Sequence, residues 1–261
     1  MTWWPVDGAE LVALQERLAV EADAARRDRP FELPDRPLLG GCFVAYARGE
    51  AGPGHPGDRA WAAVVTWRPV DGPRDEGAAL RGVSHEHGPR VARDTHEQVL
   101  VAGTVPASYE AGLLAMREGA LLEQAARRLR TPPDVLLVDA TGLDHPRRAG
   151  LAVHLGRVLD VPTVGVTHRP LHADDGPSPP GADRGSSSPV VVDGEVVAHW
   201  VVTRTGARPV VAHAGWRTTP EQALAVVLRA STPSARTPVP LGEARRVARE
   251  ARAIAAGEWP R

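Results

Sequence analysis

Two short apolar segments near the middle of the chain constrain the fold more than any other feature. DVLLVDA at 134–140 and VPTVGVTH at 161–168 are almost continuously apolar, as expected for strands buried on both faces of a sheet. Between them, HPRRAGLAVHLGRVL at 145–159 has the apolar spacing of a helix. A strand–helix–strand unit of this kind predicts two parallel strands in one sheet, and therefore an α/β fold.

The flanking segments predict antiparallel additions to that sheet. Residues 37–49 and 60–70 are predicted strands, and the Gly/Pro-rich turn at 50–58 that joins them predicts a hairpin. Part of 71–105 is expected to supply a third strand. A second hairpin is expected to turn at Asp193-Gly194. Helices are predicted within 112–130, 220–230 and 242–255. We therefore expect one domain over 1–261 with a mixed sheet, an N-terminal helical extension at 1–36 and a flexible loop at 172–189.

Composition excludes several classes of protein. The 31 basic residues, all arginine, balance 32 acidic residues at a net charge of −1, which excludes a strongly basic, non-specific nucleic-acid binder but permits a local basic face. A single cysteine, Cys42, excludes an internal disulfide. The sequence lacks an apolar run of the roughly 18 residues that a membrane span needs, and its N-terminus lacks the pattern of a signal peptide. The expected location is cytoplasmic.

Two acidic residues stand where ligands are commonly found. Glu118 follows an apolar helical run, and Asp139 comes at the end of a buried strand, the usual place for ligands in an open α/β sheet. Paired carboxylates can hold Mg²⁺ together with phosphate oxygens, and the ion then activates water for phosphodiester cleavage. The alternative for Glu118 is a solvated helix residue beside Arg117. The residues themselves leave both possibilities open.

A basic cluster follows Asp139. His145, Arg147 and Arg148 are expected to open the helix at 145–159. A helix N-terminus with guanidinium groups is suited to bind a phosphate. Ordinary helix capping and surface charge are the alternative.

Four stretches occur in an order that resembles the endonuclease V family, whose members cut beside deoxyinosine, or inosine in RNA. The most specific of them follows the pattern DxxGxxHPRRxGLAxHLG from Asp139 onward, and the likeness spans residues 37–230. The stretches are LGGCFVAY, YEAGLLAMREG, VDATGLDHPRRAGLAVHLGRVLDVPTVGV and PVVAHAGWRTTPEQALAVV. The resemblance implies a ribonuclease H-like fold, a Mg²⁺- or Mn²⁺-dependent phosphodiesterase, and inosine-containing DNA or RNA as partner.

The resemblance also implies roles for individual residues. Glu118 and Asp139 would bind the metal. Tyr109 matches a tyrosine in the loop that wedges open the strand beside the lesion, and His168 stands where the family has a catalytic lysine. Substrate binding would fall to Gly142, His145, Arg147 and Arg148.

Two departures from the family pattern affect the same implied site. Alignment from Gly40-Gly41 or from Tyr46 places Phe43 where the family has its first metal-binding acid. Trp216 stands where the family has a histidine. Phenylalanine cannot ligate a metal, so we expect cleavage to be weakened or lost. We also expect Phe43 and Trp216 to line one apolar substrate pocket.

Three functions follow from these observations. The first is a working inosine-directed nuclease, and the second is a non-catalytic nucleic-acid-binding protein. The third is a repurposed enzyme that acts on a small nucleoside-like molecule, with Cys42 and His168 as its new groups. Strand alternation puts Cys42 and Phe43 on opposite faces, however, which favours a core position for the cysteine.

Overall fold

The protein forms one mixed sheet of eight strands between two layers of helices. The computed structural model describes residues 2–47, 53–69, 95–171 and 181–257, and the strand order is β3-β2-β1-β4-β5-β8-β7-β6. The strands are β1 Leu39–Tyr46, β2 Arg59–Trp67, β3 Thr95–Thr104, β4 Val135–Val138, β5 Thr163–Thr167, β6 Ser187–Val192, β7 Glu195–Val201 and β8 Val210–Ala214. The helices are α1 Gly8–Asp28, α2 Leu114–Ala126, α3 Leu151–Leu159, α4 Pro220–Arg229 and α5 Val239–Ala255.

The centre of the sheet has the topology that the sequence predicts. β4 pairs in parallel with β1 on one side and with β5 on the other, whereas the remaining pairs are antiparallel. All four residues of β4 are buried because helices cover both faces of the sheet. The α/β, ribonuclease H-like mixed sheet is therefore confirmed.

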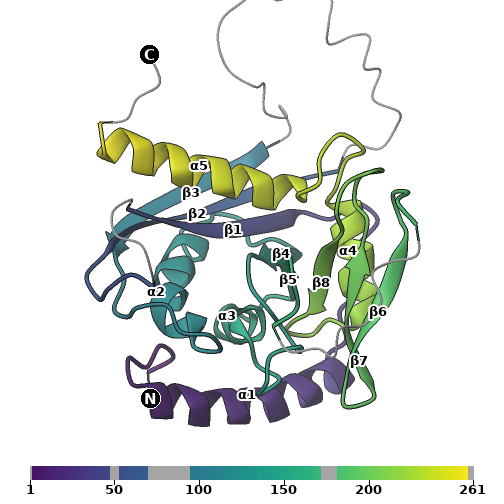
Figure 1. Cartoon of the computed structure of the whole chain (residues 1–261), viewed down its shortest axis with the longest axis horizontal. Helices are drawn as coiled ribbons and strands as arrows, with labels where there is room; N and C mark the ends of the chain where they lie inside the picture. Colours follow the sequence, from purple (N-terminus) through teal and green to yellow (C-terminus); the bar gives the residue numbers. More distant parts are fainter. Residues whose placement is uncertain (1, 48–52, 70–94, 172–180, 258–261) are drawn as a thin grey trace, which may run out of the picture.

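The helices divide between the two faces. Figure 1 shows α5 lying across β1 to β3 on one face, α2 and α3 on the opposite face, and α1 outside α3. Gly41 allows α5 to begin directly on β1, since a Cβ there would lie 2.3 Å from the backbone carbonyl carbon of Pro240. This close approach brings the first turns of α5 beside the carboxyl end of β4.

Side chains of β1 alternate between these two layers. Cys42 and Val44 belong to the core under α2 and α3, whereas Phe43 packs with Ala244 and Ala248 of α5. The expected separation of Cys42 from Phe43 is confirmed. The thiol is fully buried, so a role for Cys42 as an exposed nucleophile is wrong.

Some expected boundaries differ from the structure. The helix predicted over 145–159 begins only at Leu151, because 143–148 form turns in which Arg148 has a φ of 54°. In the segment 172–189, residues 187–189 belong to β6, and 172–180 lie outside the described residues. The turn at Asp193-Gly194 is confirmed, with both residues at positive φ. Within the described ranges, no helix has the length and apolarity that crossing a bilayer requires.

Candidate functional site

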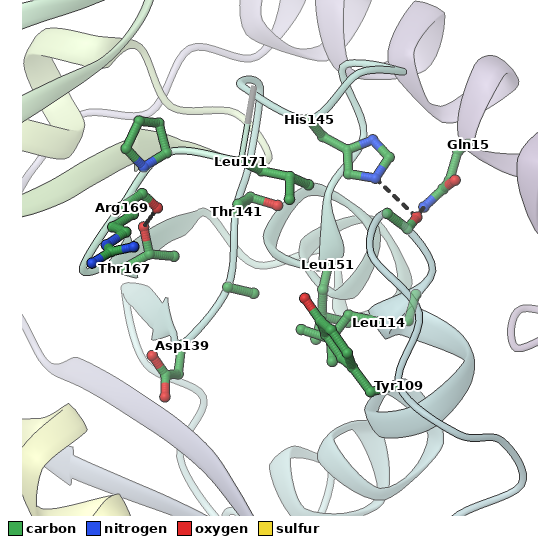
Figure 2. Close-up of a pocket in the computed structure, with 14 residues that line it drawn as sticks. Gln15, Tyr109, Leu114, Asp139, Thr141, His145, Leu151, Thr167, Arg169 and Leu171 are labelled. Carbon is green, nitrogen blue, oxygen red and sulfur yellow. Dashed lines mark hydrogen bonds between the residues drawn. The ribbon is translucent and has the colours of Figure 1, made fainter. Parts of the chain in front are cut away.

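A pocket of about 210 Å³ opens beside the carboxyl ends of β4 and β5. Figure 2 shows Tyr109, from the loop before α2, on one side of the pocket and Asp139 and Thr141, which follow β4, on the other, with the Asp139 carboxylate pointing away from Tyr109. His145 and Leu171 also line the pocket. Ligands commonly bind in the crevice outside the carboxyl ends of strands in α/β sheets. The pocket is therefore the candidate binding site, and it contains several of the residues that the sequence singles out.

Asp139 at the pocket edge is held by an arginine from the opposite end of the chain. Arg245 of α5 donates from Nη2 to Asp139 Oδ1 at 2.8 Å, and both side chains are partly buried, with 15% and 26% of their surfaces exposed. The guanidinium carbon of Arg245 also lies 5.5 Å from the centre of the Phe43 ring. A permanent positive charge thus lies beside both Asp139 and the Phe43 ring.

Glu118 is paired with a neutral partner instead. The Tyr46 hydroxyl of β1 donates a hydrogen bond to Oε1 of Glu118 in α2. Loss of hydration raises the pKa of Glu118 to about 8, and the nearby charge of Asp139 acts in the same direction, against the opposing effects of Tyr46 and Arg117. Glu118 is therefore mainly protonated at neutral pH, and its expected alternative as a solvated helix residue is wrong.

These residues do not fit a Mg²⁺ or Mn²⁺ ion. Magnesium needs hard, ionised oxygen ligands in near-octahedral positions. Asp139 already accepts from Arg245, Glu118 has a raised pKa, and Phe43 stands where the resemblance implies the family's first metal-binding acid. No group of three or more potential ligands occurs among the described His, Cys, Asp and Glu residues. The metal site implied by Glu118 and Asp139 stays a prediction that this arrangement disfavours.

The residues of the basic cluster after Asp139 hydrogen-bond to other segments of the chain and do not lie at an open helix end. Arg147 donates to Gln15 Oε1 at 2.7 Å and to the Gly112 carbonyl at 2.9 Å, and His145 Nε2 lies 2.9 Å from the same carbonyl. Arg148 points elsewhere and pairs with Glu195 at 3.0 Å. The expectation that these residues begin a helix is wrong, because α3 begins only at Leu151. Their expected role in binding a phosphate stays a prediction, and in this structure the guanidinium groups of Arg147 and Arg148 connect separate segments.

The remaining predicted site residues differ in whether they line the pocket. Tyr109 lines it with 49% of its surface exposed, so its ring is available to a ligand. His168 follows β5 and is exposed, and its pKa is lowered by partial burial and by the positive charges of Arg236 and Arg245. Gly142 is structural: a Cβ there would lie 2.0 Å from the carbonyl oxygen of Ala214.

Phe43 and Trp216 do not share a pocket. Trp216 is buried in the core between α1, α3 and β8, and the guanidinium of Arg157 covers its ring at 5.6 Å. Phe43 lies on the other face, against α5. Neither residue lines the cavity beside Asp139. The expected apolar pocket containing both aromatic rings is therefore wrong, because the sheet separates them.

A buried polar chain behind the pocket was missed at the sequence level. Asp144 and His213 have no exposed surface, and Oδ1 of the first lies 2.8 Å from Nδ1 of the second. His213 Nε2 contacts the Thr167 hydroxyl at 2.7 Å, and that hydroxyl donates to the Arg169 carbonyl at 2.6 Å. Asp144 also accepts from the Leu171 N–H at 3.0 Å. The chain fixes residues 167–171, which form one wall of the pocket.

The charge of Asp144 is stabilised by this arrangement. Burial alone would raise the pKa of its carboxyl group, but His213 and two backbone N–H donors lower that pKa below its ordinary value. No local sequence pattern connects Asp144 with His213. Likewise, Arg245 lies in a helix that the sequence predicts correctly, yet nothing local indicates its pairing with Asp139.

Comparison with known proteins identifies the family. The family model for endonuclease V matches residues 90–246. Endonuclease V of Methanopyrus kandleri is 35% identical over 218 residues, which cover 82% of this chain and 79% of the relative. The crystal structure of endonuclease V from Streptomyces avermitilis has a TM-score of 0.75 at 29% identity, with 97% and 96% of the two chains covered.

One solved structure of a more distant relative contains nucleic acid. Endonuclease V of Ciona intestinalis, in complex with a 24mer DNA containing an inosine followed by a ribo-adenosine, has a TM-score of 0.68 at 20% identity, with 93% and 96% of the chains covered. This likeness concerns the fold alone. The family match and the identity to the Methanopyrus relative establish that the chain belongs to the endonuclease V family.

Proposed function

We propose that this protein binds inosine-containing DNA or RNA with one base in the pocket beside Asp139 and does not cleave the strand by a metal-dependent route. The observation that carries this proposal is the ion pair between Asp139 and Arg245 next to Phe43. The pair leaves the base pocket accessible but neutralises the carboxylate on which metal binding would depend.

The pocket suits one flat heteroaromatic ring. Its volume of about 210 Å³ lies below the roughly 300–1,000 Å³ of sites for drug-sized ligands, so a single base is a reasonable occupant. Leu114 and Leu151 supply apolar surface, while the exposed ring of Tyr109 is available for stacking. Thr141 and the backbone at Gly112 place polar groups at the edge. A relative of this family binds DNA containing an inosine, which supports the choice of base.

The absence of cleavage follows from the charge states around Asp139. Cleavage in the family would require ionised acids that share a metal, whereas here one acid is paired with a guanidinium and the other favours the protonated form. A guanidinium carries a permanent charge but does not ligate water and lower its pKa as a bound metal does. Binding and cleavage are therefore expected to separate in this protein.

The test compares affinity with turnover on the same strands. Fluorescence polarisation with a labelled single strand containing one deoxyinosine, and with a matched strand containing adenine, is measured in EDTA. Nicking of both strands is then followed on denaturing gels with Mg²⁺ and with Mn²⁺. We expect preferential binding of the inosine strand in EDTA, no nicking, and loss of the preference in Tyr109→Ala.

A matched control is available on the outer helix. Val20 of α1 is 71% exposed and lies outside the pocket, so Val20→Ala should bind as the parent does. Metal-dependent nicking that disappears in Asp139→Ala would overturn the non-cleaving half of the proposal. Equal affinity for inosine and adenine strands would overturn the base-recognition half.

A further inference from the structure

Two arginines of α5 lie against the aromatic ring that replaces the first acid of the family. The guanidinium carbons of Arg245 and Arg249 lie 5.5 and 5.4 Å from the centre of the Phe43 ring. They are four residues apart on one helix, so both project from the same face toward β1. Phe43 therefore acts as a platform that places two positive charges near Asp139.

Positive charge exceeds negative charge around this platform. Arg236 and Arg245 both lie near His168, whose pKa is lowered by partial burial and by these two positive charges. Among the described residues, Asp139 is the acid that forms an ion pair with Arg245. A group of arginine charges that exceeds the neighbouring acidic charge attracts anions.

Arg245 retains hydrogen-bonding capacity beyond Asp139. A guanidinium has five N–H donors, and the pair with Asp139 uses Nη2. Nη1 lies 3.4 Å from the Thr237 hydroxyl, a long contact. Nε is buried and has no hydrogen-bond partner within the part of the chain that the structure describes. A buried donor of this kind normally has a partner, so Arg245 has the capacity for at least one further acceptor.

We propose that Arg245 and Arg249 form a metal-independent seat for a phosphodiester phosphate, with guanidinium groups in place of the metal ion. Asp139 connects this seat with the pocket, since it lines the pocket and orients Arg245. A nucleotide whose base lies against Tyr109 then places a backbone phosphate over the Phe43 platform. The identity of that nucleotide rests on the function proposed above, whereas the phosphate seat stands on the α5 arginines alone.

The chemistry of arginine suits this task. A guanidinium binds phosphate through parallel N–H···O bonds and stays charged at all physiological pH values. Asp139 restricts the Arg245 side chain, which reduces the entropy lost on binding. The seat therefore supplies attraction and orientation for the strand without activating water.

The experiment measures binding of labelled single strands in EDTA across a series of salt concentrations. Arg245→Ala and Arg249→Ala are compared with Arg246→Ala, which removes the same charge from the same helix but pairs with Glu243 and Glu250 in the parent. Removal of either seat arginine should weaken inosine and adenine strands alike, by about tenfold for one charged hydrogen-bonded contact. The slope of log affinity against log salt should become shallower by about 0.7 per lost phosphate contact.

The outcomes separate the seat from the base pocket. Equal weakening of both strands by the seat variants, with Arg246→Ala unchanged, supports the seat even where the parent shows no inosine preference. Arg249→Ala removes an exposed side chain, so its result stands even if Arg245→Ala unfolds. Affinities of both seat variants equal to that of Arg246→Ala would overturn the seat, as would parent binding that EDTA abolishes.

Discussion

Replacement of Glu118 by glutamine should stabilise the protein increasingly as the pH rises. The pKa of this acid is raised from 4.5 to about 8 in the folded protein, so the folded state favours the protonated form. The stability of the parent that depends on this proton is fully present below pH 4.5 and is lost as the pH rises toward 8. Glutamine keeps an acceptor for the Tyr46 hydroxyl but has no proton to lose.

The magnitude follows from the size of the pKa shift. One pKa unit corresponds to 1.36 kcal/mol, so the stability difference between Glu118→Gln and the parent should grow by about 1.4 kcal/mol per pH unit between roughly pH 5 and pH 7. The total at pH 7 is then about 3 kcal/mol. For a domain of this size, that difference corresponds to a change in Tm of roughly 6–12 °C.

Urea unfolding of both proteins at several pH values between 5 and 8 measures this difference directly. Glu110→Gln is the matched control, because Glu110 is exposed on the loop before α2 and the same chemical change there should leave the pH profile unaltered. A stability difference between Glu118→Gln and the parent that does not change with pH would refute the assignment. It would mean that Glu118 is ionised at neutral pH and available as a metal ligand.

Three further predictions concern the buried parts of the site. His213→Ala should lower the free energy of unfolding by roughly 3–5 kcal/mol, because it leaves the Asp144 charge buried without its partner. Urea titration measures this loss, and a loss under 1 kcal/mol would contradict the prediction. Gly142→Ala should prevent stable folding, since its Cβ would meet a β8 carbonyl at 2.0 Å, whereas Gly242→Ala in α5 should be tolerated; thermal melts distinguish them. Cys42 should resist a thiol reagent until the protein unfolds, because the thiol is buried and burial raises its pKa well above the ordinary value. Rapid labelling of the native protein would show instead that β1 opens in the folded state.

The arginine seat proposed above changes what the site can do. A divalent ion attracts phosphate and also activates water, whereas a guanidinium provides only the attraction. Phe43 contributes to this change by giving Arg245 and Arg249 an aromatic surface on which to lie. Phe43 of β1 and the two arginines of α5 thus form one cluster on the α5 face of the sheet.

The elements that depend on local patterns were predictable from the sequence. The apolar runs at 134–140 and 161–168 indicate buried parallel strands because only a strand covered on both faces has no reason to alternate. Asp193-Gly194 indicates its turn because both residues tolerate positive φ. The helix around 151–159 was predicted with the wrong start, because contacts of His145 and Arg147 with Gly112 hold the preceding residues in turns.

The charge states of the site depended on the tertiary structure. Asp139 and Arg245 are 106 residues apart, and only the close approach of α5 to β1 at Gly41 brings them together. The pKa of Glu118 is raised because folding removes its water, and no property of the neighbouring sequence specifies that loss. The sequence by itself determined the fold, the family and the position of the acids, since these follow from local patterns and motif spacing. Whether those acids carry a charge, and which cation they meet, was decided by packing between distant segments.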